Sequence, residues 1–246
     1  MSRLVYGVGP VRELVKARAQ AVHVVYLLGG EQNPALKDLV KLCNERKVAL
    51  EERERGELDA LASSDARHQG VIAITGEFQY ADLDDVLDAV TGRPLIVFLD
   101  GVEDPRNLGA IVRSAHVLGA HAVVVAKDRA APVTPVTVKT SAGATEHLPI
   151  CRVTNIVRAL ESVKERGLWV VGAFAKRAQA PSAVDLTGPI ALVLGAEGRG
   201  IRALVERNCD HRVEIPMTGH VASLNVSVAA GILLYEASRQ RAMLKA

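Results

Sequence analysis

The chain has 246 residues, which is enough for one large domain or for two domains of unequal size. Hydrophobic residues make up 49% of it and aromatic residues only 3%, so we expect an aliphatic core, and a domain that stacks bases on aromatic side chains is disfavoured. The formal net charge of +2 does not by itself indicate a nucleic-acid partner.

The first part of the chain predicts a small α/β/α domain over residues 1–75. Apolar runs typical of strands alternate there with segments of helical periodicity. The acidic segment 76–94 has little strand character and ends in Gly-Arg-Pro, so we expect a linker with one short helix. The elements expected before it are strands at 22–29 and 70–76 and helices near 10–19, 34–47 and 57–63.

Residues 95–246 predict a second domain, in which short aliphatic strands alternate with helices. This pattern is typical of a parallel sheet covered by helices on both faces. The expected strands are 95–100, 122–126, 168–174, 190–195 and 212–216, and the expected helices are about 107–118, 154–166, 200–207 and 223–242. The predicted fold class is therefore α/β, with a parallel-sheet C-terminal domain and a smaller N-terminal one.

Three glycine-rich or polar loops between residues 190 and 232 each join an aliphatic run. The stretches read IALVLGAEGRG, RVEIPMTGH and VASLNVSVAAGI. A buried strand that ends at such a loop is typical of a loop that contacts a ligand. Three such loops close together in the sequence therefore predict one binding site built mostly from backbone. Gly195, Gly198 and Gly200 form GxxGxG instead of the GxGxxG dinucleotide fingerprint, and the chain has no GxxxxGK[ST] phosphate loop.

The helix expected after the strand at 95–100 carries candidate residues for catalysis. Asn107 is placed to cap this helix at its N-terminus. Gly109 and Arg113 share a face, and the small glycine leaves room for a substrate backbone beside the guanidinium. The other neighbours of Arg113 are apolar, so we expect its side chain to face a cleft or to form an ion pair.

The polar residues of the three loops are the other candidates. Glu197 lies between two glycines, where it either caps the helix that follows or pairs with Arg113. Ser223, Asn225 and Ser227 lie at the start of the last helix, whose free backbone N–H groups favour anionic or carbonyl partners. Capping accounts for one of these three side chains, which leaves the others available to a ligand.

The cysteine content and the hydropathy of the chain indicate the cellular compartment. Cys43, Cys151 and Cys209 have no metal-ligand spacing and are typical of small buried residues in a reducing compartment. No apolar run reaches the length of a membrane span, and the N-terminus lacks the apolar segment of a signal peptide. We therefore expect a soluble cytoplasmic protein without a metal site or a membrane partner.

Several of these segments together resemble a known family. NLGAIVRSA, GAEGRG and IPM followed by SLNVSVAAGI, in this order and at this spacing, are similar to the three signature motifs of the SpoU (TrmH-type) RNA ribose 2′-O-methyltransferases of the SPOUT class. KTSAGATEHLPI (139–150) also matches this family. YGVGPVREL and HQGVIA resemble the small ribosomal-protein-like RNA-binding domain of one branch, which methylates a guanosine ribose in 23S ribosomal RNA.

The resemblance implies features of fold and cofactor that composition and periodicity do not reveal. It implies a deep trefoil knot in the C-terminal domain, S-adenosylmethionine (SAM) as the cofactor, and a homodimer with its sites at the subunit interface. By motif position, it implies that Gly195, Ile215 and Leu224 hold SAM, largely through backbone groups.

The resemblance also implies roles for the polar candidates. Arg113, Glu197 and Asn225 are expected to be catalytic, and Asn107 and Ser223 are expected to contact the substrate RNA. The expected reaction is direct transfer of the SAM methyl group to a ribose 2′-hydroxyl, which requires no metal.

The expected substrate is 23S ribosomal RNA or a large-subunit precursor, bound by residues 1–75, with residues 76–94 as linker and residues 95–246 binding SAM. Two alternatives stay open. One is a methyltransferase of the same fold that acts on a transfer RNA ribose, and the other is a ribosome-assembly factor that binds RNA without catalysis. A nucleotide-dependent oxidoreductase is disfavoured by the glycine spacing.

Overall fold

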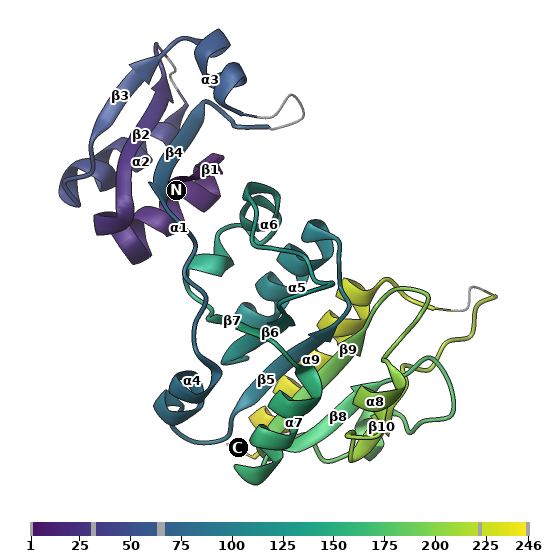
Figure 1. Cartoon of the computed structure of the whole chain (residues 1–246). Helices are drawn as coiled ribbons and strands as arrows, with labels where there is room; N and C mark the ends of the chain where they lie inside the picture. Colours follow the sequence, from purple (N-terminus) through teal and green to yellow (C-terminus); the bar gives the residue numbers. More distant parts are fainter. Residues whose placement is uncertain (1, 31–32, 63–66, 221–222, 245–246) are drawn as a thin grey trace. The chain divides into compact units, whose positions relative to one another are not determined.

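The structure is a computed structural model, and it describes residues 2–30, 33–62, 67–220 and 223–244. Its contacts divide the chain into two compact units, which Figure 1 shows with the labels of their helices and strands. Unit 1 comprises Met1–Gln79 and Val133–His147, and unit 2 comprises Tyr80–Pro132 and Leu148–Ala246.

Unit 1 is a small α/β unit built on a four-stranded sheet. Its elements are β1 (Ser2–Tyr6), α1 (Val8–Arg18), β2 (Val22–Leu28), α2 (Pro34–Glu45), β3 (Leu50–Arg53), α3 (Arg55–Leu61), β4 (Val71–Gly76) and, from later in the chain, α6 (Pro135–Thr140). The strand order is β1-β4-β2-β3, with β4 antiparallel to both β1 and β2 and with β3 parallel to β2. Residues of α1 and α2 form one hydrophobic core with the sheet, and α3 contributes to a smaller second core.

The segment Val133–His147 belongs to unit 1 although it comes from the middle of the chain. Val138 of α6 is fully buried in the core with α1 and α2. The buried carboxylate of Glu146 accepts hydrogen bonds from Arg3 Nη2 at 2.9 and 3.0 Å. Lys139 Nζ donates a hydrogen bond to Gln69 Oε1 at 2.5 Å. The sequence does not predict this packing, because contacts between distant segments leave no local periodicity.

Unit 2 is built on a six-stranded sheet of order β10-β8-β9-β5-β6-β7, in which every strand is parallel to its neighbours. Its strands are β5 (Leu95–Asp100), β6 (Ala122–Ala126), β7 (Ile150–Val153), β8 (Trp169–Ala173), β9 (Ile190–Gly195) and β10 (His211–Val213). Its helices are α4 (Leu83–Ala89), α5 (Pro105–Val117), α7 (Ile156–Glu165), α8 (Ala203–Glu206) and α9 (Val226–Met243).

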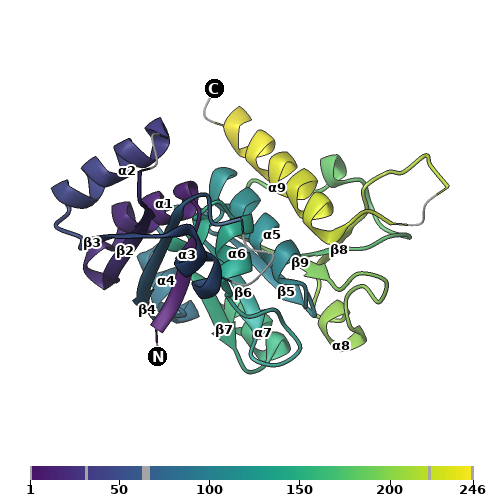
Figure 2. The same cartoon turned by 90° about the horizontal axis from the view of Figure 1, so that it is seen from above.

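Helices cover both faces of this sheet. All six residues of β5, LIVFLD, are buried, as expected of a strand with helices on both sides. Residues of α4, α7 and α8 pack on one face around Ile96, Phe98 and Val193. The other face carries α9, which packs against α5, and Figure 2 shows α9 and α7 on opposite sides of the sheet. The predicted α/β fold with a parallel sheet is confirmed.

Some local predictions differ from the structure. The strands β1, β3 and β7 are not predicted, because charged or polar residues interrupt their apolar runs: β1 reads SRLVY, β3 reads LEER and β7 reads ICRV. The prediction that Asn107 caps α5 is wrong: the helix begins at Pro105, and Asp104 caps it by accepting a hydrogen bond from the Arg106 N–H at 2.8 Å. Among the helices that the structure describes, none is long and apolar enough to cross a membrane.

Candidate functional site

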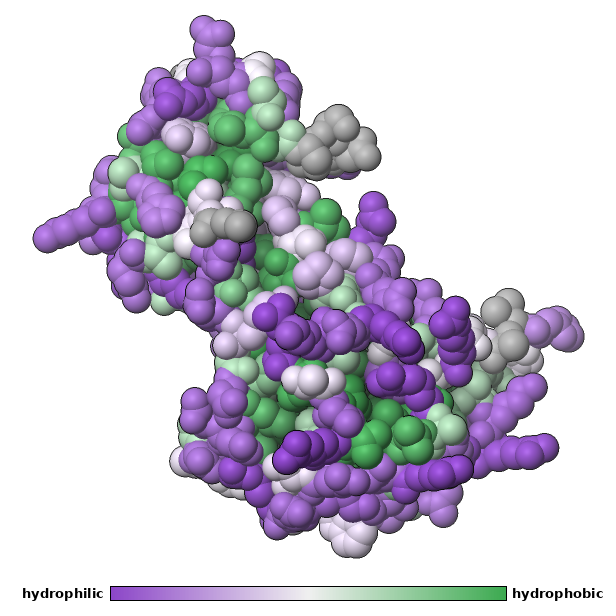
Figure 3. All heavy atoms as spheres, viewed as in Figure 1, coloured by the Kyte–Doolittle hydropathy of each residue, from purple (hydrophilic) through white to green (hydrophobic). Residues whose placement is uncertain are grey.

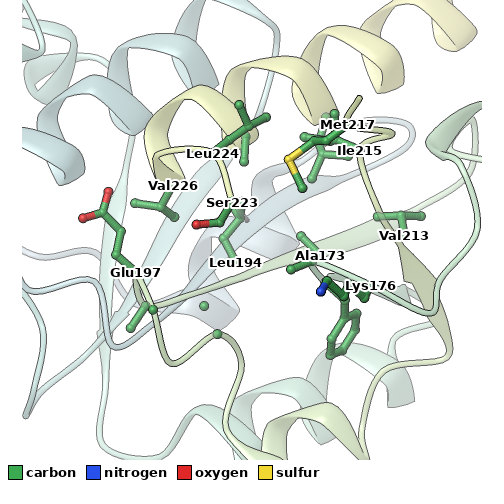
Figure 4. A pocket seen from close by; sticks show the side chains of 18 residues that line it. Ala173, Lys176, Leu194, Glu197, Val213, Ile215, Met217, Ser223, Leu224 and Val226 are labelled. Carbon is green, nitrogen blue, oxygen red and sulfur yellow. The ribbon is translucent and has the colours of Figure 1, made fainter. Parts of the chain in front are cut away.

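A cavity of about 390 Å³ lies in unit 2 at the carboxyl ends of β8, β9 and β10. All three predicted loops line it, together with residues of α9. Most of its wall is apolar, and its two charged lining residues, Glu197 and Lys176, lie on different sides of it (Figure 4). The cavity also brings together four residues expected from the sequence to bind a ligand, Gly195, Ile215, Ser223 and Leu224.

The loop after β9 is a tight hairpin. Ala196 N–H donates a hydrogen bond to the Gly200 carbonyl at 3.2 Å, and Gly200 N–H donates to the Ala196 carbonyl at 2.9 Å. Gly198 and Gly200 have φ values of +78° and +67°, in the left-handed region that favours glycine. A Cβ atom on Gly195 would lie 2.1 Å from the Gly200 carbonyl carbon and 2.3 Å from Ile201 N. Only glycine therefore lets the end of β9 approach the returning chain this closely.

A buried ion pair fixes the chain beyond this hairpin. Asp100, the last residue of β5, is 1% exposed and lies opposite Gly195 in the strand register. Its Oδ1 accepts a hydrogen bond from Arg202 Nε at 2.7 Å and lies 2.6 Å from Arg202 Nη2, while its Oδ2 accepts one from the Arg202 N–H at 2.8 Å. Because a buried carboxylate requires such partners, the pair holds the segment after the hairpin against the end of β5.

Three polar side chains from distant segments meet beside the cavity. Asn225 Nδ2 donates hydrogen bonds to Glu197 Oε1 at 2.5 Å and to Asn107 Oδ1 at 3.0 Å. Asn107 Nδ2 donates to the same Glu197 oxygen at 3.4 Å. The Asn225 side-chain oxygen caps α9 by accepting hydrogen bonds from the N–H groups of Ser227 and Val228. Glu197 is therefore held by two amides and does not cap α8, whose N-cap residue is Arg202.

The thiols of the chain are not poised for nucleophilic chemistry. Burial raises the pKa of Cys43 to about 11, of Cys151 to about 12 and of Cys209 to about 11. Thiols with such pKa values are protonated at neutral pH and are weak nucleophiles. Among the described residues, no group of three or more His, Cys, Asp and Glu side chains could hold a metal ion.

Comparison with known proteins identifies the family of this chain. Residues 94–235 match the family model described as SpoU rRNA Methylase family, and residues 4–81 match the model described as RNA 2′-O ribose methyltransferase substrate binding. The chain belongs to the SpoU rRNA methylase family. The resemblance of the sequence motifs to SpoU proteins is thereby confirmed, and so is the predicted class of enzyme, an RNA 2′-O-methyltransferase.

The similarity to SpoU proteins extends over nearly the whole chain. The chain is 44% identical over 246 residues to the 23S rRNA (guanosine-2′-O-)-methyltransferase RlmB of Pseudomonas syringae pv. tomato, and the alignment covers 98% of each chain. The SpoU methyltransferase AviRb from Streptomyces viridochromogenes, solved in complex with AdoMet, has a TM-score of 0.82 and 29% identity, over 98% of this chain and 91% of that chain. The TrmH/SpoU tRNA modifying enzyme of A. aeolicus has a TM-score of 0.58 and 33% identity, over 66% of this chain and 84% of that chain.

Arg113 is the SpoU motif residue whose surroundings differ most from the expectation. The neighbouring residues Leu108 and Val112 of α5 are buried, but Arg113 itself is exposed and does not line the cavity. Within the described residues it forms no ion pair, and the hydrogen bonds of Glu197 come from Asn107 and Asn225 instead. The expected cleft or ion-pair partner of Arg113 is therefore not found within the described part of one chain.

Sequence reasoning missed several residues in and around the cavity. Lys176 follows β8, and its position at the carboxyl edge of a parallel sheet is a signal that could have indicated it, because ligands bind at that edge in open α/β sheets. The pairing of Asp100 with Arg202 has no such signal, because the two residues are 102 positions apart and each resembles an ordinary surface charge in the sequence.

Proposed function

We propose that this protein transfers the methyl group of SAM to the 2′-hydroxyl of a guanosine ribose in 23S ribosomal RNA. The observation that carries this proposal is the similarity over 98% of both chains to a relative named for that reaction. The similarity to the tRNA-modifying enzyme extends over only 66% of this chain, which favours ribosomal RNA over transfer RNA.

The residues of the cavity fit SAM as a cofactor. A volume of about 390 Å³ lies within the range of small-molecule sites, and the apolar walls suit an adenine ring. Gly195, Ile215 and Leu224 would hold the cofactor largely through backbone groups of the three loops. When bound, SAM supplies a methyl group on a sulfonium sulfur. This sulfur is a good leaving group, so the methyl transfer needs no metal. The AdoMet complex of AviRb, a structural relative, supports this assignment.

The cluster beside the cavity suits the positioning of a ribose hydroxyl. The Glu197 carboxylate is an acceptor for the hydroxyl proton, and Asn107 and Asn225 hold that carboxylate in place. Ser223, which lines the cavity, would contact the RNA. A guanidinium offers donors and no acceptor, so Arg113 does not serve as a general base; we assign it the binding of the hydroxyl or a neighbouring phosphate and the stabilisation of negative charge on the attacking oxygen.

The two parts of the chain receive different roles in this proposal. Residues 1–75 would bind the substrate RNA, residues 76–94 would connect the two parts, and residues 95–246 would bind SAM, except that Val133–His147 packs within unit 1 and α4 of the connecting segment packs within unit 2. The family models support this division, because the substrate-binding model matches residues 4–81 and the methylase model matches residues 94–235. Membership of the SpoU family supports a deep trefoil knot in the C-terminal domain.

A homodimer in the cytoplasm completes the proposal. Three apolar side chains at helical spacing on α9 are exposed: Val228 at 49%, Ile232 at 39% and Tyr235 at 60%. Such a stripe on a helix is suited to cover by a second copy of the chain. The three unpaired cysteines are compatible with a reducing compartment.

The test is a methyl-transfer assay with labelled SAM. The protein is incubated with 23S ribosomal RNA, with large-subunit precursor particles and with transfer RNA, and the labelled nucleotide is mapped. We expect label on a guanosine 2′-oxygen of 23S RNA, either free or in the precursor. Label confined to transfer RNA would show a tRNA methyltransferase, and label in none of the three would favour an assembly factor without catalysis.

A further inference from the structure

A second cavity lies in unit 2, beyond the carboxyl ends of β6 and β7 and beside α8; we call it the β6–β7 cavity. Its volume is about 620 Å³. The residues of its wall that matter here are Arg129, Ile156, Val157, Arg202 and Leu204. None of these residues lines the cavity assigned to SAM, so the β6–β7 cavity is a separate space on the same edge of the sheet.

One stretch of chain connects the two cavities. The hairpin that ends at Gly200 lines the SAM cavity, and Arg202 and Leu204, which follow directly, line the β6–β7 cavity. The hydrogen bonds of Arg202 to the buried carboxylate of Asp100 fix this stretch against the end of β5. The β6–β7 cavity therefore has a fixed position next to the loop that carries Glu197.

The wall of the β6–β7 cavity combines cationic and apolar side chains. Arg129 and Arg202 contribute two guanidinium groups, against a single carboxylate from Asp128. Arg129 forms no ion pair within the described part of the chain, and its backbone φ of +55° lies in the left-handed region, which is uncommon for a residue with a side chain. Half of the Arg202 side chain, 52%, is exposed despite its bond to Asp100.

The apolar part of this wall is open to solvent. Leu204 is 64% exposed, while Ile156, which lines the same cavity, is buried in the core. Figure 3 shows hydrophobic side chains at the surface beside α8, with hydrophilic side chains around them. Guanidinium groups next to an exposed apolar surface are suited to a nucleotide, whose phosphate is anionic and whose base has an apolar face.

We propose that the β6–β7 cavity binds a nucleotide of the substrate RNA that neighbours the methylated one. Arg129 and the free edge of the Arg202 guanidinium bind a phosphate, and Leu204 contacts the base. The proposal rests on the proposed RNA methyltransferase function. The position of the cavity supports it as well, because the stretch of chain that follows the hairpin carrying Glu197 continues into the wall of the β6–β7 cavity.

The test uses substitutions that leave the buried ion pair intact. Arg202 is a poor probe, because its removal would leave the carboxylate of Asp100 buried without a charged partner. Arg129→Ala and Leu204→Ser change exposed side chains, and neither residue lines the SAM cavity. Arg207→Ala is the matched control, since it removes an equal charge from the other end of α8 without touching the cavity.

The measurement is the affinity of the full-length variants for a synthetic RNA fragment centred on the nucleotide that the labelled-SAM assay maps, and for fragments trimmed on either side. We expect Arg129→Ala to bind the full fragment about 5- to 10-fold more weakly and to lower the slope of log affinity against log salt by about 1, as for one lost phosphate contact. Leu204→Ser is expected to weaken binding at all salt concentrations without changing that slope. Trimming the RNA fragment on the side that reaches the β6–β7 cavity should weaken RNA binding by the wild type and leave RNA binding by Arg129→Ala almost unchanged.

The outcomes separate this proposal from the function on which it rests. Equal affinity and equal sensitivity to trimming in the wild type, Arg129→Ala and Leu204→Ser would overturn the cavity proposal alone. A wild type that binds SAM in calorimetry but labels no RNA would contradict the proposed function, and the cavity proposal would be withdrawn with it. A loss of SAM affinity in Arg129→Ala would also count against a separate nucleotide site.

Discussion

Asn225 connects the last helix of unit 2 to the hairpin after β9: its amide nitrogen donates a hydrogen bond to Glu197 Oε1 at 2.5 Å, while its amide oxygen caps α9. One side chain therefore carries a contact that stabilises a helix and a contact that holds a proposed catalytic carboxylate. Because the two contacts use different atoms, substitutions can separate them.

Asn225→Ser keeps a capping oxygen but is too short to reach Glu197, whereas Asn225→Ala lacks both contacts. We expect both variants to lower kcat by about 10- to 100-fold, because the Glu197 carboxylate loses its shortest hydrogen bond. Only Asn225→Ala should also lower the free energy of unfolding, by about 1 kcal/mol, through loss of the cap. Methyl-transfer kinetics and denaturant unfolding check the two effects. Full turnover in Asn225→Ser would remove Asn225 from the catalytic cluster.

Gly195→Ala tests the close approach at the end of β9. Its Cβ atom would lie 2.1 Å from the Gly200 carbonyl carbon, so the hairpin must move away. We expect a loss of about 1–3 kcal/mol in the free energy of unfolding and a weaker affinity for SAM, because the same hairpin lines the cavity. Gly188→Ala is the matched control: no atom lies within 4 Å of its added Cβ, and its stability should stay within about 0.5 kcal/mol of the wild type. Unchanged SAM affinity in Gly195→Ala, measured by calorimetry, would contradict the backbone-built site.

Arg113→Ala tests the assignment of the exposed guanidinium on α5. Loss of one well-placed group that stabilises charge should raise the barrier by about 2.7–4 kcal/mol, which lowers kcat about 100- to 1000-fold. Arg113→Lys should recover part of this rate, since it keeps a positive charge but loses the planar fork of donors. SAM affinity should not change, because Arg113 does not line the cavity. Arg106→Ala removes another exposed arginine of the same helix and should keep near-normal turnover. Near-normal turnover in Arg113→Ala as well would show that the assignment is wrong.

Glu236 on α9 gives unit 2 a dependence of stability on pH. Hydrogen bonds from Arg239 Nε and Nη2, both at 2.7 Å, and a further one from Gln240 lower the pKa of this carboxyl to about 2. Because this pKa is lower in the folded chain than the ordinary value of 4.5, the carboxylate stabilises the fold above about pH 4.5, and its contribution is lost as the pH falls towards 2.

Glu236→Gln should therefore flatten the fall in the free energy of unfolding between pH 4.5 and about 2. Urea unfolding at a series of pH values measures this fall. Glu161→Gln changes an exposed glutamate of α7 and is the control. An equally steep fall in Glu236→Gln and in the wild type would show that the Arg239 contact does not persist in solution.

Much of the fold follows from local sequence patterns. Apart from Asp100 at the end of β5, the strands β5 and β9 are continuous apolar runs, because helices cover both faces of the sheet and the buried side chains of these strands have no contact with water. The single helix α4 lies within the predicted linker, where its cap residue Asp82 is visible in the sequence. The edge strand β3 escapes prediction because it is short and polar, so no alternation marks it.

The sequence by itself determined the family, the parallel sheet and the three loops that line the cavity proposed to bind SAM, since motifs and strand ends consist of consecutive residues. Only the tertiary structure decided that Asn107 and Asn225 share the carboxylate of Glu197, that Arg202 pairs with Asp100 and thereby fixes the β6–β7 cavity, and that Val133–His147 packs within unit 1. The physical reason is the same in each case. A hydrogen bond or ion pair between distant segments imposes no spacing or periodicity on either one, so its partners are identified only when the folded chain brings them together.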